Sequence, residues 1–219
     1  MLSTELKMEK EILKTGTTTL GIVCKDGIVL AADKRATAGY LLASKKVEKV
    51  IPISDSMAIT TAGVVSDIQL LTKIIKAQLK FDSLRTGKQP NVKESANLLA
   101  GIIYGNIRKF STIAGIVDFL LAGRDNTGFY LYDLGIDGSI TPYDDFASTG
   151  SGSVMAYGVL ETLYVKNMSV DEGIKLAVKA VNAAIQRDIA SGNGIDVITI
   201  TDKGVKKVLE KEINTKLVI

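Results

Sequence analysis

Between residues 17 and 63, hydrophobic residues are grouped in short runs that polar residues and glycines separate. The runs at 17–25 and 28–34 are joined by Asp26-Gly27, a strong signal for a tight β-hairpin turn. Two further runs, at 46–53 and 57–63, have the same texture. The pattern therefore predicts four strands in this part of the chain.

The period of the hydrophobic positions changes after Gly63. Apolar residues then recur at steps of three or four, as in an amphipathic helix, at Val64, Ile68, Leu71, Ile75 and Leu79. A second helix is predicted over 92–110. The glycines between 101 and 115 predict that this helix is irregular.

The rest of the chain repeats this order of strands followed by helices. The predicted elements are strands at 117–123, 129–134 and 139–148, helices at 153–166 and 170–189, and closing strands at 196–201 and 204–209. Ser169 and Glu172 have the spacing of a capping box at the start of the second of these helices. This is a simpler interpretation of Asn167-Met168-Ser169 than a glycosylation acceptor.

Grouped strands with hairpin-length connections argue for antiparallel sheets that are covered by helix pairs. The segment Ile195–Ile200 is apolar on both faces, so it has to be covered on both sides. We therefore expect an α+β fold, a four-layer αββα sandwich of two stacked antiparallel sheets flanked by helix pairs.

Length and composition indicate one globular domain. The chain has 219 residues, of which 46% are hydrophobic and 23% charged. No apolar stretch approaches the roughly 18 residues that a membrane span needs. Residues 1–16 are polar and rich in lysine and glutamate, and they predict a separable leader rather than a secretory signal. We expect a cytoplasmic protein without a membrane partner.

The charged and metal-ligating residues argue against several functions. The net charge is only +3, with basic residues scattered among acids, so nucleic-acid binding is not expected. There is no histidine, and the single cysteine, Cys24, is expected to be buried on a strand. Asp144-Asp145 fits a solvated turn better than a cation site. Nucleotide-binding glycine patterns fail in spacing, so we expect no metal and no cofactor.

The glycine and threonine run Gly16-Thr17-Thr18-Thr19 carries the most informative chemistry. Without histidine, a hydrolytic nucleophile has to be activated by a lysine, a carboxylate or a freed α-amino group. Three threonines at a strand start are also ordinary β composition. Gly16 favours a functional interpretation, because a residue without Cβ lets the Thr17 hydroxyl approach its own upstream carbonyl.

Three charged residues have unusual positions. Asp33 and Lys49 lie in apolar surroundings, although a surface ion pair accounts for them equally well. Asp188 is predicted at the C-terminal end of a helix, where the helix macrodipole disfavours a carboxylate. A charge in such a position indicates a functional role.

Five sequence blocks follow one another in a recognisable order. They are Gly16-Thr17-Thr18-Thr19-Leu20-Gly21, Ala32-Asp33-Lys34-Arg35-Ala36-Thr37, Thr61-Ala62-Gly63, Ser148-Thr149-Gly150-Ser151-Gly152-Ser153 and Gln186-Arg187-Asp188-Ile189-Ala190-Ser191-Gly192. Together they resemble the catalytic β subunit of the archaeal proteasome core, an N-terminal threonine hydrolase. The resemblance implies the N-terminal nucleophile hydrolase fold, a propeptide of residues 1–16 that is removed autocatalytically, and one catalytic domain over 17–219.

The same resemblance implies a mechanism. Thr17, freed as the N-terminus by a cut after Gly16, is the nucleophile and forms an acyl-enzyme ester that water resolves. The general base is either the Thr17 α-amino group or Lys49, and the sequence does not choose between them. The other implied catalytic residues are Asp33, which orients Lys49; Gly63, whose N–H faces the oxyanion; and Ser151, Asp188 and Ser191, which hold the amino group and a water.

The positions that match the S1 pocket of the family are small or apolar. They are Ala36, Val47, Ile51, Thr61 and Val65, with Arg35 and Thr37 beside the cleft. They imply cleavage after apolar residues, with Thr37 pairing to the substrate main chain. The implied partners are proteasome α subunits and other β subunits in stacked seven-membered rings, a regulatory ATPase that acts through the α rings, and unfolded protein substrates.

Three other functions fit parts of the pattern. A β-type subunit that assembles without cutting should lack Thr17, Lys49 or Gly16, and all three are present. The bacterial two-component protease of the same fold has shorter chains. A small-molecule amidase with an N-terminal nucleophile should be active without ring assembly.

Overall fold

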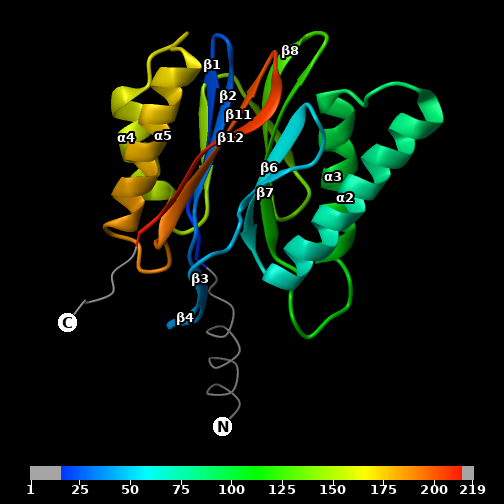
Figure 1. The fold of residues 1–219 in the computed structure, drawn as a ribbon. Coiled ribbons are helices and arrows are strands. Elements are labelled where there is room, and N and C mark those ends of the chain that lie inside the picture. Colours follow the sequence, from blue (N-terminus) through cyan, green and yellow to red (C-terminus); the bar gives the residue numbers. More distant parts are fainter. Residues whose placement is uncertain (1–15, 214–219) are drawn as a thin grey trace.

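The computed structural model describes residues 16–213, which form two stacked sheets with a pair of helices on each outer face (Figure 1). The elements are β1 Thr19–Cys24, β2 Gly27–Asp33, β3 Ala36–Ala38, β4 Leu41–Ser44, β5 Val50–Pro52, β6 Met57–Gly63, α2 Val65–Thr86, α3 Val92–Ile107, β7 Val117–Asp125, β8 Gly128–Leu134, β9 Ile140–Tyr143, β10 Phe146–Thr149, α4 Ser153–Leu163, α5 Val170–Ile185, β11 Gly194–Thr201 and β12 Gly204–Glu212. This is the expected four-layer αββα sandwich.

Each large sheet has five antiparallel strands. The first has the order β10-β1-β2-β11-β12 and is covered by α4 and α5, and the second has the order β5-β6-β7-β8-β9 and is covered by α2 and α3 (Figure 1). The short strands β3 and β4 form a separate hairpin. Of the predicted leader only Gly16 is described; residues 1–15 and 214–219 lie outside the described part.

Three apolar layers fill the spaces between these elements. Val197 on β11 packs with the core beneath α4 and α5, whereas its neighbour Ile198 packs between the two sheets. Phe119 on β7 belongs to the third core, beneath α2 and α3. Because successive side chains of a strand point to opposite faces, β11 needs cover on both sides, and the expectation from its two-sided apolar sequence is confirmed.

Several local predictions are confirmed by the backbone. The β1–β2 hairpin closes at Cys24 and Gly27, and the β11–β12 hairpin closes at Thr201 and Gly204. Ser169 caps α5 in a complete capping box with Glu172. Cys24 is buried on β1, where desolvation raises the pKa of its thiol to about 12. None of the described helices is long and apolar enough to cross a bilayer.

Two strand predictions are wrong in extent. Of the segment 46–53 only Val50–Pro52 is a strand, because Lys46 and Glu48 are exposed and face charged partners on β12 and its surroundings. The segment 139–148 is divided at the Asp144-Asp145 turn, because the chain crosses there from one sheet to the other. The β3–β4 hairpin was not predicted, since its strands are short and none of their residues is buried.

The predicted helix ends are also too late. The helices predicted to reach residues 110, 166 and 189 end at Ile107, Leu163 and Ile185. Gly101 lies inside a regular α3, so the predicted irregularity is absent there. Asp188 therefore lies beyond α5 rather than in its last turn, in a segment that bends toward Thr17.

Two acidic residues lie together between the sheets. Asp118 on β7 and Asp133 on β8 have the same side-chain parity as Leu120 and Leu131, which belong to the inter-sheet core. One carboxylate oxygen of each is buried without a hydrogen-bond donor in the described part of the chain. Desolvation, with a further contribution from Asp133, raises the pKa of Asp118 to about 7. A shared proton therefore holds this pair below neutral pH.

We predict that Asp118→Asn stabilises the fold at pH 8 more than at pH 5. The unfolded carboxyl ionises near pH 3.8 and the folded one near 7, so the wild-type protein loses stability as the pH rises through this window. A pKa difference of about three units between the unfolded and folded states corresponds to roughly 4 kcal/mol in the free energy of unfolding. Asparagine keeps a donor toward Asp133 without the proton. Thermal unfolding at both pH values measures the difference.

The matched control is Asp55→Asn at an exposed aspartate whose carboxylate has no hydrogen bond or ion pair to residues 16–213. It should change the melting temperature little at either pH. Equal effects of Asp118→Asn at pH 5 and pH 8 would contradict the shared proton.

Candidate active site

Thr17 lies just before β1, and only 5% of its surface is exposed. Its Oγ1 accepts a hydrogen bond from Lys49 Nζ at 3.0 Å and donates one to the Gly16 carbonyl oxygen at 2.7 Å. The hydroxyl is therefore placed between a cation and the carbonyl of its own upstream peptide bond.

Lys49 and Asp33 form a buried ion pair of 2.8 Å, with the side chains 5% and 0% exposed. Asp33 is the last residue of β2, and Lys49 immediately precedes β5, where Thr61 N donates to its carbonyl. This burial decides against the surface ion pair that the sequence also allowed. Desolvation lowers the pKa of Lys49, although the nearby Asp33 carboxylate acts in the opposite direction.

The Asp33 carboxylate is held on both oxygens. Its Oδ1 accepts from Thr18 N at 2.9 Å as well as from Lys49, and its Oδ2 accepts from Arg35 N and Gly192 N, both at 2.9 Å. A buried carboxylate with four donors is fixed in orientation next to its lysine.

A second arm of hydrogen bonds reaches the Thr17 nitrogen. Thr17 N donates to Ser151 Oγ at 3.2 Å, and Ser151 Oγ donates to Asp188 Oδ2 at 2.6 Å. Ser191 Oγ bonds the same Asp188 oxygen at 2.6 Å and lies 2.6 Å from Thr18 Oγ1. The structure thus brings Ser151, Asp188 and Ser191 together, and of these Ser151 contacts the Thr17 nitrogen. Their implied role in holding the freed amino group and a water stays a prediction.

Two glycines allow the backbone to approach closely here. A Cβ at Gly16 would lie 1.8 Å from Ala190 Cβ, so no other residue fits before Thr17 in this conformation. Gly63 has a φ of +120°, and a Cβ there would lie 2.2 Å from the Ile116 carbonyl oxygen. Both positions therefore require glycine, because a side chain would clash with neighbouring atoms of the site.

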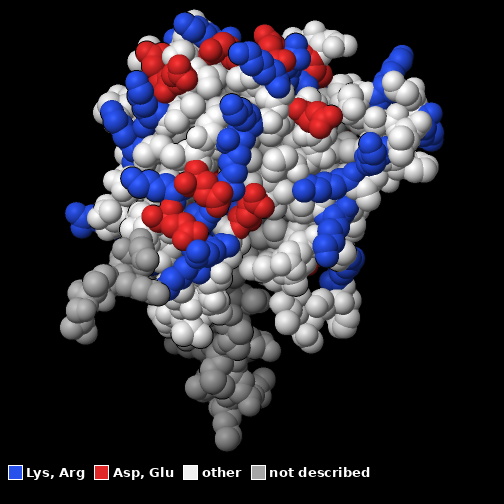
Figure 2. All heavy atoms as spheres, viewed as in Figure 1, with Lys and Arg blue, Asp and Glu red and all other residues white. Residues whose placement is uncertain are grey.

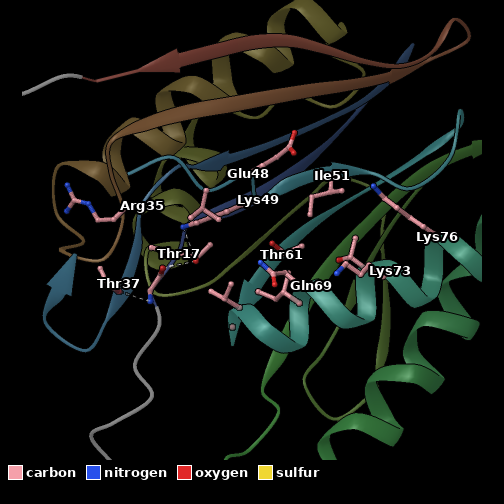
Figure 3. A pocket seen from close by; sticks show the side chains of 17 residues that line it. Thr17, Arg35, Thr37, Glu48, Lys49, Ile51, Thr61, Gln69, Lys73 and Lys76 are labelled. Atoms are coloured by element: carbon pink, nitrogen blue, oxygen red, sulfur yellow. Dashed lines mark hydrogen bonds between the residues drawn. The ribbon is translucent and has the colours of Figure 1, made fainter. Parts of the chain in front are cut away.

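A cavity of about 280 Å³ opens beside Thr17, between β5, β6 and the start of α2 (Figure 3). All of the residues predicted for substrate binding line it, namely Arg35, Ala36, Thr37, Val47, Ile51, Thr61 and Val65, and Gly63 also borders it. Thr37 lies next to the chain entering the site, because its Oγ1 accepts from Gly16 N at 3.3 Å.

The cavity also contains polar and charged residues that the sequence analysis missed. They are Glu48, Gln69, Thr72, Lys73 and Lys76. The sequence signal for the four α2 residues is their helical spacing from Val65. Gln69, Thr72, Lys73 and Lys76 follow Val65 by four, seven, eight and eleven positions, which places them on the same helix face. Neither lysine forms an ion pair with a described residue. The cavity wall therefore combines apolar residues with cationic side chains along α2, and Glu48, the one carboxylate among its described lining residues, is paired with Lys207.

Arg35 borders the cavity, but its guanidinium is directed away from Thr17, toward the segment before β11 (Figure 3). Its Nη1 donates to the Ile189 carbonyl at 2.7 Å, and its Nε donates to Asn193 Oδ1 at 2.8 Å. The expected position beside the cleft is present, whereas the charged end faces the protein.

Charges of both signs are interleaved on the face shown in Figure 2, where acidic and basic side chains gather over β12. Lys34, next to Asp33, forms a buried ion pair with Asp196 at 3.0 Å, and Lys207 and Glu210 extend this network to the surface. Asp144 and Asp145 lie in the turn between β9 and β10. Within residues 16–213, no three potential metal ligands of the His, Cys, Asp and Glu types come together.

Comparisons with known proteins agree with this geometry. The family model described as proteasome subunit matches residues 13–200. A proteasome subunit beta of Ferroglobus placidus is 43% identical over 92% of this chain and 94% of its own length. A proteasome subunit beta of Archaeoglobus profundus is 43% identical over 91% of both chains, and proteasome subunit beta 1 of Thermococcus onnurineus is 42% identical over 92% of this chain and 97% of its own. The chain therefore belongs to the proteasome subunit family, as a β-type member.

Proposed function

We propose that this chain is a threonine endopeptidase subunit of the proteasome core, with Thr17 as its nucleophile. The observation that carries the proposal is the contact of Thr17 Oγ1 with Lys49 Nζ at 3.0 Å, backed by buried Asp33 and placed at the edge of a cavity. A hydroxyl beside a lysine of lowered pKa has the arrangement that nucleophilic catalysis needs.

The first reaction of the site is removal of residues 1–16. Thr17 Oγ attacks the Gly16 carbonyl carbon and loses its proton to a base, and the acyl group moves from the Thr17 nitrogen to its oxygen. Water then cleaves this ester, which leaves the Gly16 carboxylate and a free Thr17 amine. The 2.7 Å contact between Thr17 Oγ1 and the Gly16 carbonyl oxygen supports this step, because the two groups are already adjacent.

The second reaction is peptide hydrolysis. Thr17 Oγ attacks the substrate carbonyl, the amine product leaves with a proton, and water resolves the acyl-enzyme ester. Lys49 accepts the hydroxyl proton, or the freed α-amine does so with Ser151 and Asp188 beside it. The Gly63 N–H is proposed as the oxyanion donor at the cavity rim, where one such donor contributes about 3–4 kcal/mol.

Assembly is the natural setting for this activity. We propose that the chain joins α subunits and other β subunits in stacked seven-membered rings in the cytoplasm, and that an ATPase at the α rings supplies unfolded proteins. Large apolar side chains that are exposed in the single chain support burial in such contacts; Tyr40, Leu84, Phe110 and Ile189 are each more than 70% exposed.

The cavity predicts a ranking of substrates. We expect peptides with leucine before the cut to be hydrolysed fastest, glutamate to be intermediate, and lysine to be at least about tenfold slower than leucine. The apolar residues Val47, Ile51 and Val65 favour leucine. Lys73 and Lys76, which form no ion pair within residues 16–213, repel a cation while tolerating an anion. Rates of cleavage of three otherwise identical peptides measure this order.

Charge reversal on α2 tests the cause of the ranking. Lys73→Glu and Lys76→Glu should raise the relative rate of the lysine peptide, whereas Lys80→Glu, at an exposed position of α2 outside the cavity, should not. Equal rates for the leucine and lysine peptides in the wild type would refute the proposed preference.

The proposed function as a whole is tested on the chain assembled with α subunits. Intact-mass measurement should find that wild type has lost residues 1–16 and that Thr17→Ala has kept them. A wild-type particle that hydrolyses peptides while it keeps the leader would contradict the mechanism.

A further inference from the structure

The side chain of Arg35 binds the segment 189–193, which is distant from it in the sequence. Its two side-chain hydrogen bonds, to the Ile189 carbonyl at 2.7 Å and to Asn193 Oδ1 at 2.8 Å, span the segment 189–193 from one end to the other. Between these two contacts the guanidinium lies flat against Gly192. A Cβ at Gly192 would lie 2.5–2.8 Å from Nη2, Cζ and Nε of Arg35.

The backbone beside Arg35 holds the same segment from below. Gly192 N donates to Asp33 Oδ2 at 2.9 Å, and Lys34 N donates to the Gly192 carbonyl at 3.1 Å. Three consecutive residues at the end of β2 thus fix Gly192 by a carboxylate, a backbone amide and a guanidinium.

The segment 189–193 adjoins the hydrogen bonds that lead through Ser151 to the Thr17 nitrogen. Asp188 immediately precedes the segment and Ser191 lies within it. The hydroxyls of Ser191 and Ser151 both donate to Asp188 Oδ2. Asn193, at the far end, has a φ of +62°, a conformation that asparagine tolerates better than most residues. The segment follows the end of α5 without belonging to a helix or strand, so the contacts of Asp33, Lys34 and Arg35 contribute to its position.

We propose that Arg35 is a positioning residue for the reaction, which holds Asp188 and Ser191 in place so that Ser151 can orient the Thr17 amine. The proposal rests on the proposed function of Thr17. It assigns to Arg35 a role different from the substrate contact that its place beside the cleft implied, because the guanidinium points away from Thr17 and both of its hydrogen bonds go to the protein (Figure 3).

The experiment compares four variants of the assembled, processed particle. Arg35→Ala should lower kcat by about 10–100-fold and change KM by less than about threefold, because a displacement of about 1 Å in a catalytic group has effects of this size. Arg35→Lys should recover only part of the loss, since an ammonium cannot reproduce the hydrogen bonds of the planar guanidinium to both Ile189 and Asn193. Asn193→Ala, which removes one of the two partners, should have a smaller effect of the same kind.

The matched control is Arg187→Ala. Arg187 lies one residue before Asp188, is exposed, and makes no side-chain hydrogen bond or ion pair to residues 16–213. It should leave both kcat and KM unchanged. A loss of activity in this variant equal to that of Arg35→Ala would reduce the effect to loss of any positive charge and overturn the proposal.

A double-mutant cycle separates positioning from general structural damage. In an Asp188→Asn background, Arg35→Ala should lower kcat little further, because both changes disrupt the same hydrogen bonds from Asp188 to Ser151 and Ser191. Full additivity, or a rise in KM at constant kcat, would overturn the proposal and restore the substrate contact. If Arg35→Ala does not assemble, the cycle is run with Asn193→Ala and the same outcomes decide. A wild type without activity would instead refute the proposed function, whereas an active wild type with an unaffected Arg35→Ala refutes only this inference.

Discussion

Thr17→Ala is expected to abolish peptide hydrolysis by the assembled particle, with a loss of at least about 10⁴-fold, and to keep residues 1–16 attached. Both effects have one cause. The hydroxyl between Lys49 Nζ and the Gly16 carbonyl is the proposed nucleophile for the leader and for substrates. Peptide cleavage rates and intact mass, measured on the same preparation, check the two effects.

Thr17→Ser is the control for this prediction, because it keeps the hydroxyl and removes only the methyl group. It should lose the leader and retain a substantial part of the activity. If Thr17→Ala still loses the leader, another protease or a neighbouring subunit makes that cut. If Thr17→Ala also hydrolyses peptides, the nucleophile has been assigned to the wrong residue.

Lys49→Arg is expected to lower peptide hydrolysis by about 10³-fold while the chain still folds. Arginine keeps the positive charge next to Asp33 but cannot give up its proton in the working pH range. General base catalysis typically contributes about 10²–10⁴-fold, so the predicted loss lies within this range. Because desolvation lowers the pKa of Lys49, the wild-type rate should rise with pH through a value below that of a free lysine, and the variant should lack this rise.

The control is Lys203→Arg, at an exposed lysine in the turn between β11 and β12. It should behave as the wild type does. Near-normal activity of Lys49→Arg, once its leader is removed, would identify the freed Thr17 amine as the base. Asp33→Asn adds a test of stability, because the loss of one partner of a buried ion pair typically costs about 3–5 kcal/mol.

The fold was predictable where burial leaves a local pattern. The helical period after Gly63, the turn at Asp26-Gly27 and the two-sided apolar strand at residues 195–200 each state which faces are covered, and together they specify two sheets between helix pairs. The β3–β4 hairpin left no such pattern, since its strands are short and none of their residues is buried. Element ends were predicted less well, because helix propensity continues past the residue at which tertiary contacts turn the chain.

The candidate site was predictable mainly through the resemblance. Without it, the threonine run was ordinary strand composition, and Asp33 and Lys49 were equally compatible with a surface pair. The cavity lysines of α2 belong to none of the five sequence blocks, and only the helix that begins at Val65 places them beside the cavity.

The sequence by itself determined the order of strands and helices, the need for two stacked sheets, and the residue types available for chemistry without histidine. These properties follow from local periodicity and composition. Only the tertiary structure decided that Asp33 and Lys49 are a buried pair, that Arg35 turns from the cleft to the segment before β11, and that lysines line the cavity. Each of these contacts joins residues that are distant in sequence, up to 158 positions for Arg35 and Asn193. Such contacts depend on strand order and register, which no local pattern encodes.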